Sequence, residues 1–174
     1  MATERFAGKA FRLVSEEVVL PSGRVTTRDV VRHPGAVAIL PLLLNPLGCV
    51  LLHQHRHAIG GSLWEIPAGT RDRADETPAE CARRELIEET GYAAGEMRLV
   101  KQFYTAPGFC DERMWLYVAW DLVPHAPGAQ DEDERIVVHR LPWDQVRAMC
   151  DDGRIEDAKT LVALGWLHSV MSDG

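Results

Sequence analysis

Three glutamates stand close together near the end of a predicted helix, in the stretch RRELIEETGY that covers residues 83–92. At 100° per residue, Glu85, Glu88 and Glu89 fall within an arc of about 100° and therefore share one face. Like charges four residues apart destabilise a helix by roughly 0.2–0.5 kcal/mol, and carboxylates in the last turn also oppose the helix dipole. Converging carboxylates become favourable when a hard divalent cation lies among them. A solvated, charged helix face is the alternative interpretation.

The ends of this helix are marked by residues with known capping roles. Thr77, Pro78 and Glu80 form a predicted capping box, with proline at the first helical position. Gly91 is a natural end point, because glycine enters the left-handed conformation without a Cβ clash. Between these ends, alanine and leucine recur at three- and four-residue spacing and give a narrow apolar stripe. The sequence therefore predicts a helix over residues 77–90, with the glutamates beside its buried face.

Length and composition limit the class of protein. The 174 residues, 46% of them hydrophobic, suffice for one globular domain with a small addition. A net charge of −7 argues against partners such as nucleic acid and against a basic membrane-binding face. Four scattered cysteines without a C-x-x-C pair fit neither a zinc ribbon nor a dense disulfide framework, and indicate a reducing compartment. No signal-like or bilayer-spanning apolar run is seen, so we expect a soluble, cytoplasmic protein.

The other predicted elements are mostly strands. Residues 10–32 form a hairpin around a Pro-Ser-Gly turn, slightly apart from the rest of the chain, and a second hairpin with buried strands turns at residues 45–48. The remaining expectations are a strand at 62–67, a loop at 67–76, strands at 97–105, 113–123 and 135–141, a loop at 124–134, a helix capped by Asp144 that ends near Cys150, and a helix from about Glu156 to Met171.

The residues around the first helix follow a longer spaced pattern. Gly69 is followed after six residues by Glu76, and after seven more by RELIEETGY, from Arg84 to Tyr92. This resembles the Nudix box, G-x5-E-x7-R-E-U-x-E-E-x-G-U, where U is a bulky apolar residue. Every defined position from Glu76 to Gly91 is met. One extra residue lies between Gly69 and Glu76, in a loop where an insertion costs little. By this resemblance the chain is identified as a Nudix hydrolase.

The resemblance implies roles for the box residues. In Nudix hydrolases the helix holds Mg²⁺ or Mn²⁺ over a diphosphate, because a metal ion neutralises the charge that repels an attacking water and lowers the pKa of that water. Glu85 and Glu89 are expected as principal ligands, Glu88 as a ligand of a further ion, and the carbonyl of Ala68 as another ligand. Structural roles are expected for Gly69, Glu76, Arg84 and Gly91.

Stretches outside the box resemble the ADP-ribose pyrophosphatase branch: GAVAIL, HQHRHAIGG, WEIPAG, DEDERIVVH, GRIEDAKTLVALGWL, and YTAPGFCDE with Pro107 fifteen residues after Tyr92. This implies an α/β/α sandwich around a mixed sheet, and hydrolysis of ADP-ribose or a related nucleoside diphosphate sugar to AMP and a sugar phosphate. It also implies a homodimer through an N-terminal β region at 1–33, ahead of a Nudix domain at 34–174. Apolar alternation in residues 10–32, too extensive for an exposed hairpin, supports the dimer.

The same resemblance gives candidates for substrate binding, which are Arg56, Pro107, Gly108 and Glu112. Arg56 would contact the phosphates, with a plain surface arginine as the alternative, and Glu112 would hydrogen-bond the terminal ribose. The family often brings its general base on a flexible loop just before a strand. Glu134 matches that position best and Glu132 is second, while a solvated acidic loop is the alternative.

Other interpretations stay open. His53, His55 and His57 alternate along a predicted strand and would be metal ligands if they line one face. Trp64 and Trp115 are candidates for stacking on a base, against the more common role in a core. Rival functions are a nucleoside triphosphate pyrophosphohydrolase, which the proline after the box disfavours, and a non-catalytic ADP-ribose-binding sensor. Such a sensor usually loses box glutamates and carries a DNA-binding extension.

Overall fold

The computed structural model describes residues 2–126 and 136–172. The strands are β1 (Ala2–Ala7), β2 (Arg12–Val19), β3 (Val25–Arg32), β4 (Ala36–Leu44), β5 (Leu47–Arg56), β6 (Gly61–Glu65), β7 (Ala68–Thr70), β8 (Tyr92–Tyr104), β9 (Arg113–Pro124) and β10 (Ile136–Pro142). The helices are η1 (His57–Ile59), α1 (Pro78–Thr90), α2 (Trp143–Asp151) and α3 (Ala158–Ser172).

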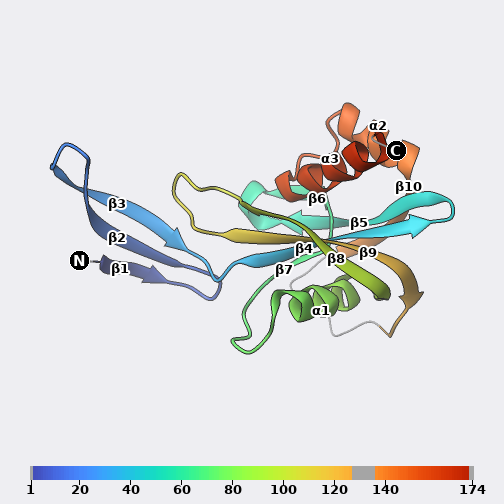
Figure 1. The fold of residues 1–174 in the computed structure, drawn as a ribbon, viewed down its shortest axis with the longest axis horizontal. Coiled ribbons are helices and arrows are strands. Elements are labelled where there is room, and N and C mark those ends of the chain that lie inside the picture. Colours follow the sequence, from blue (N-terminus) through green and yellow to red (C-terminus); the bar gives the residue numbers. More distant parts are fainter. Residues whose placement is uncertain (1, 127–135, 173–174) are drawn as a thin grey trace.

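A mixed sheet of seven strands lies at the centre of the molecule, with helices on both faces (Figure 1). Its main path is β10-β5-β4-β9-β8, while β6 pairs with β5 and β7 pairs with β4. Strands β4 and β9 run parallel, and the other neighbours are antiparallel. Helix α1 covers one face, and α2 and α3 cover the other. The predicted α/β/α sandwich around a mixed sheet is confirmed.

Strand β4 shows how one sheet serves two cores. Successive side chains of a strand point to opposite faces. Ala38 therefore packs in the core that includes Leu164 of α3, whereas Val37 and Ile39 pack in the core that includes Leu86 of α1. Because both faces are covered, the strand is apolar at consecutive positions and shows no polar alternation.

Helix α1 begins and ends where the sequence predicts. The Thr77 hydroxyl oxygen accepts the Glu80 amide at 3.3 Å, and the Glu80 carboxylate accepts the Thr77 amide at 2.9 Å. These reciprocal bonds make the capping box. Gly91 has φ of 69°, and its amide donates to the Ile87 carbonyl at 2.9 Å. The glutamate face is thus carried by a helix whose two ends are fixed by local contacts.

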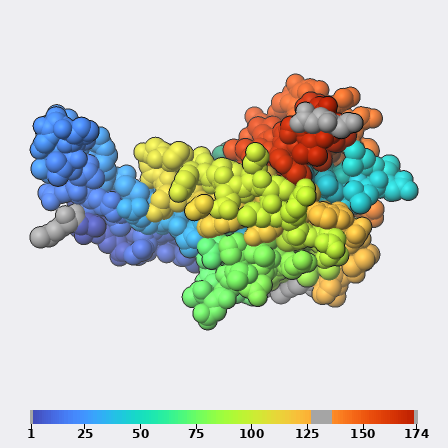
Figure 2. Space-filling model, viewed as in Figure 1, coloured from blue at the N-terminus to red at the C-terminus, as the bar shows by residue number. Residues whose placement is uncertain are grey.

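The N-terminal strands form a separate sheet, β1-β2-β3, that extends away from the main body (Figures 1 and 2). The sequence predicts only the β2–β3 hairpin. Strand β1 is exposed along its whole length, so it carries no buried face that would leave an apolar pattern. The sheet joins the body at the β8–β9 loop, where the Val31 amide donates to the Phe109 carbonyl at 2.8 Å and the Asp111 amide to the Val31 carbonyl at 3.1 Å.

Three other details differ from the sequence prediction. Strand β7 lies inside the predicted loop 67–76, because its pairing partner β4 is distant in sequence. The predicted cap at Asp144 is wrong, since α2 begins at Trp143 with Pro142 in the capping position and no side-chain cap. Helix α3 starts after Asp157, whose carboxylate accepts the Thr160 amide at 2.9 Å.

No helix in residues 2–126 and 136–172 is long and apolar enough to cross a membrane.

Candidate active site

Arg84 is the centre of an ionic network on α1. Its Nε and Nη2 donate to the two carboxylate oxygens of Glu76, at 2.9 and 3.0 Å. Its Nη1 donates to Glu85 at 2.7 Å and to Glu88 at 2.8 Å. The bonds to Glu76, above all, raise the pKa of Arg84. One guanidinium therefore offsets the repulsion among three carboxylates and ties the loop before the helix to the helix itself.

Glu85 packs directly against the backbone of β7 at Gly69. A Cβ at this position would lie 2.0, 2.1 and 2.4 Å from the three carboxylate atoms of Glu85, so any larger residue would displace that side chain. Burial raises the pKa of Glu85, and the charges of Glu88 and Asp72 act in the same direction, although Arg84 opposes them. A carboxylate in these surroundings would be stabilised by a nearby cation.

Glu89 is held at the same junction between α1 and β7. Its side chain is buried, and its carboxylate accepts the Ala68 amide at 2.8 Å. This bond sets the carboxylate beside the residue whose carbonyl the sequence proposes as a ligand. The tertiary structure thus brings Glu85 and Glu89 onto the two adjacent residues Ala68 and Gly69.

Arg56 at the end of β5 is paired with Glu65 at the end of β6. Its Nε and Nη2 each donate to one carboxylate oxygen of Glu65, both at 2.7 Å. These bonds raise the pKa of Arg56, burial opposes them, and the charges of Glu65, Glu89 and Asp157 add to the increase. Arg56 therefore lies within the electrostatic reach of Glu89 on α1. The pairing of Glu65 with Arg56 was not predicted from the sequence. A charged residue inside the otherwise apolar strand SLWEIP could have indicated a buried ion pair.

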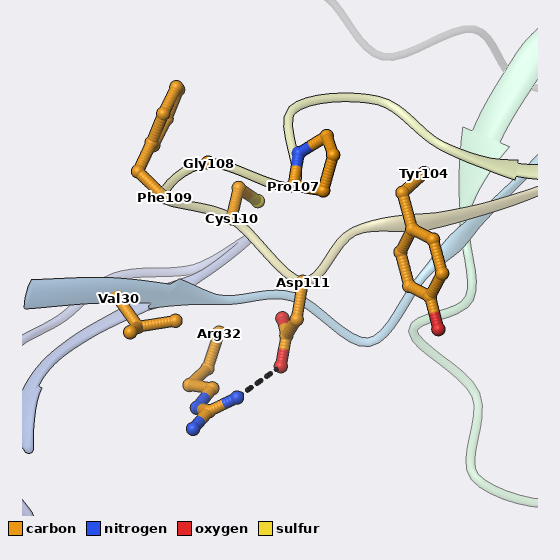
Figure 3. A pocket seen from close by; sticks show the side chains of 8 residues that line it. All are labelled: Val30, Arg32, Tyr104, Pro107, Gly108, Phe109, Cys110 and Asp111. Atoms are coloured by element: carbon orange, nitrogen blue, oxygen red, sulfur yellow. Dashed lines mark hydrogen bonds and ion pairs between the residues drawn. The ribbon is translucent and has the colours of Figure 1, made fainter. Parts of the chain in front are cut away.

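The other substrate-binding candidates lie where the N-terminal sheet meets the β8–β9 loop. Pro107 and Gly108 line a pocket of about 270 Å³ (Figure 3). The remaining lining residues are Val30, Arg32, Tyr104, Phe109, Cys110 and Asp111. Glu112 accepts the Thr105 hydroxyl at 2.5 Å and faces His33 at 3.6 Å. These contacts of Glu112 thus lie within this region, whereas Glu85 and Glu88 are bonded to Arg84 on α1.

The family of the chain is shown by its match to known proteins. The NUDIX domain family matches residues 32–164, which include the whole box and the sheet that carries it. The chain belongs to the Nudix family. Nudix hydrolases generally need divalent cations, so oxygen donors that could hold such an ion are expected around α1.

Several named relatives share most of the chain. A methanol dehydrogenase activator from Bacillus methanolicus is 39% identical, over 94% of this chain and 88% of its own length. An ADP-ribose pyrophosphatase from Mycobacterium tuberculosis is 43% identical, over 94% and 79%. A GDP-mannose pyrophosphatase from Citrobacter koseri is 36% identical, over 81% of each chain. A solved ADP compounds hydrolase superposes with a TM-score of 0.85 at 21% identity, covering 99% of this chain and 92% of that one, and shows the same fold.

The Nudix box supplies donors that suit a divalent cation. Glu85, Glu88 and Glu89 carry carboxylates and Ala68 a backbone carbonyl, and such hard oxygen donors are the kind that Mg²⁺ prefers. Because Gly69 has no side chain, the Glu85 carboxylate can lie directly against β7 at the position after Ala68. Across the described residues, no three His, Cys, Asp or Glu side chains are arranged as a ready-made metal cage, and the Arg84 guanidinium supplies the positive charge between Glu85 and Glu88.

Both tryptophan candidates and His53 have protein partners in this Nudix fold. The ring centroid of Trp64 lies 4.8 Å from that of His53 and 4.7 Å from that of His139. Trp115 lies near two guanidinium groups, those of Arg71 at 4.9 Å and Arg113 at 5.5 Å. These contacts account for both tryptophans as parts of the packed structure.

The two candidates for the general base, Glu132 and Glu134, lie outside the residues that the structure describes. Their assignment therefore rests on their sequence position, just before β10.

Proposed function

We propose that the protein hydrolyses the diphosphate bond of ADP-ribose or a related nucleoside diphosphate sugar, giving a nucleoside monophosphate and a sugar phosphate. The observation that carries this proposal is the junction of β7 with α1, where Glu85 packs on Gly69 and Glu89 accepts the Ala68 amide. The names of the relatives support this substrate class, since two of them act on ADP-ribose and GDP-mannose.

In this proposal the box holds Mg²⁺, with Mn²⁺ as the alternative, through Glu85, Glu88, Glu89 and the carbonyl of Ala68. When bound, the ion neutralises charge on the diphosphate and makes a bound water more acidic. The paired side chains of Arg84 and Glu76 keep the box loop in place against the helix.

The remaining roles belong to residues that contact the substrate. Arg56, already oriented by Glu65, donates hydrogen bonds to phosphate oxygens. Glu112 hydrogen-bonds the terminal ribose, and the loop at Pro107 and Gly108 lies beside it. A general base removes the proton from the attacking water. Glu134 is the first candidate for that base, and a comparison of kcat in Glu134→Gln and Glu132→Gln decides between them.

A substrate panel tests the proposal. ADP-ribose, ADP-glucose, GDP-mannose and ATP would be compared by chromatographic measurement of the nucleoside monophosphate released, with Mg²⁺, with Mn²⁺ and with a chelator. We expect kcat/KM for one of the sugar nucleotides to exceed that for ATP by about tenfold or more, a difference of about 1.4 kcal/mol in transition-state stabilisation. Preferred cleavage of ATP would favour a triphosphate pyrophosphohydrolase. Tight binding of ADP-ribose without cleavage would favour a sensor.

We further propose a cytoplasmic homodimer built through the N-terminal sheet. Several large apolar side chains on this sheet are exposed, with Val19 at 72%, Val25 at 58% and Phe6 at 54%. Large apolar side chains exposed on a protruding sheet are typical of an interaction surface.

Light scattering tests the dimer. At micromolar concentration we expect a particle of twice the 19.4 kDa chain mass. Phe6→Glu should shift the particle toward the monomer, because a charge would be buried in the interface. Lys9→Glu, an exposed charge change next to β1, is the control and should leave the mass unchanged. A wild-type monomer would contradict the proposal.

A further inference from the structure

Four charged side chains form a buried ionic cluster beside the α1 glutamates, and only one of them has a role in the mechanism so far. The cluster consists of Arg56, Glu65, Asp157 and Lys159, two cations and two anions. Glu65 is the most buried, at 1% exposure. Lys159, in the first turn of α3, has a side chain that is 11% exposed, whereas that of Arg56 is 39% exposed. The cluster therefore reaches from the core to the surface through Arg56.

Lys159 binds the same carboxylate as Arg56. Its Nζ donates to Glu65 Oε2, the same oxygen that accepts Arg56 Nη2, and also to Asp157 at 3.0 Å. Burial acts to raise the pKa of Glu65, but the Arg56 hydrogen bonds and the Lys159 charge lower it. Removal of one partner from a buried ion cluster leaves an uncompensated charge, which is strongly destabilising. Glu65 thus depends on both cations to stay charged in the core.

The contact with Glu65 fixes how Arg56 presents its guanidinium. Two parallel bonds from Nε and Nη2 hold the planar group in one orientation. Within the described residues, Glu65 is the only hydrogen-bond partner found for the Arg56 guanidinium, and its bonds use Nε and Nη2, so the hydrogens on Nη1 stay available to a phosphate. A guanidinium held by one edge and open at the other suits bidentate or single contact with phosphate oxygens.

Helix α3 also holds the backbone that leads into the box. Thr160 Oγ1 accepts the buried Ile66 amide at 2.9 Å, and the Thr160 hydroxyl donates to Asp157 at 2.6 Å. Two residues after Ile66, the Ala68 amide donates to Glu89. The segment at 65–68 is therefore fixed by α3 at one end and by α1 at the other.

From these contacts we propose that Lys159 is a positioning residue for phosphate binding, acting through Glu65 on Arg56. The C-terminal helix then contributes to how tightly the diphosphate is held. The inference rests on the proposed function, in which Arg56 contacts the phosphates. The competing explanation is that the buried ionic cluster only stabilises the fold.

Kinetics of Lys159 variants with ADP-ribose and saturating Mg²⁺ separate these explanations. Lys159→Met should raise KM about tenfold and lower kcat much less, by analogy with the residues that orient metal ligands, whose loss typically costs about 10–100-fold in affinity or activity. Lys159→Arg keeps the charge and should restore most of the affinity. Arg154→Met removes a cation from an exposed ion pair just before α3, where its side chain is 52% exposed, and should leave KM unchanged. A wild-type KM in folded Lys159→Met would overturn the inference.

A second variant, in which the overall charge of the cluster stays neutral, separates an effect on binding from an effect on folding. Glu65→Gln combined with Lys159→Met removes one charge of each sign, so the cluster stays neutral overall. Asp157 keeps its hydrogen bonds from Thr160, and the glutamine oxygen still accepts one bond from Arg56. We expect a melting temperature close to that of the wild type together with the raised KM. A folded double variant with wild-type KM would show that the buried ionic cluster has no role in binding.

Failure of the proposed function would be seen separately, as a wild-type protein that cleaves no sugar nucleotide. In that case NMR tests the inference without substrate, through the rate at which the Arg56 Nε–H exchanges with water. The resonance is assigned by its loss in Arg56→Lys. It should exchange slowly with water in the wild type and in Lys159→Arg, and rapidly in Lys159→Met. Slow exchange in Lys159→Met would overturn the inference.

Discussion

Glu85→Gln and Glu89→Gln should each lower kcat by about 100-fold or more, because metal-ion stabilisation of transition-state charge is worth several kcal/mol and a neutral amide is a poor ligand for a hard cation. The fold should survive. Glu85→Gln removes repulsion from Glu88, and the amide oxygen of Glu89→Gln still accepts the Ala68 amide. Rates and melting temperatures would be measured together, with and without Mg²⁺.

Two comparisons make this test specific. Added metal should raise the melting temperature of the wild type, since a ligand that binds only the folded state stabilises it, and this increase should shrink in both variants. Glu80→Gln is the control on the same helix, because glutamine also completes a capping box. Unchanged activity in Glu85→Gln or Glu89→Gln would remove the metal-site assignment.

Gly69→Ala should cost about 100-fold in kcat, the loss that a displacement of about 1 Å at a reacting centre produces. The new Cβ would lie 2.0 Å from the Glu85 carboxyl carbon, and the side chain must move to relieve that contact. Stability should change little, because rotation of one side chain is enough to remove the clash.

Gly165→Ala is the matched control for this substitution. It adds a methyl group in α3 where nothing lies within 4 Å, and should slightly stabilise the helix without changing kcat. A Gly69→Ala protein with wild-type kcat would show that the position of Glu85 against β7 is not needed for turnover.

Helix α1 was fully predictable because its determinants are local. The capping bonds join Thr77 and Glu80, which are three residues apart, and Gly91 ends the helix through its own backbone conformation. The shared face of the glutamates follows from helical geometry alone. The burial of the central strands was also predictable from local sequence, since β4 and β5 are apolar at consecutive positions.

Contacts between distant segments decided the rest. Strand β7 and the exposed strand β1 carry no apolar pattern of their own, so only their pairing with β4 and β2 defines them. Asp144 has the residue type of a cap, but Pro142 occupies the capping position and α2 starts two residues earlier than expected.

The sequence by itself determined the box, the helix that carries it and the class of ligand that three carboxylates on one face would attract. Only the tertiary structure placed Glu85 on Gly69, and only it joined Lys159 to Glu65, which are separated by 94 positions along the chain. The physical reason is that residue type and spacing report local conformation, whereas a buried charge acquires its partner only when the segments that carry both are packed together.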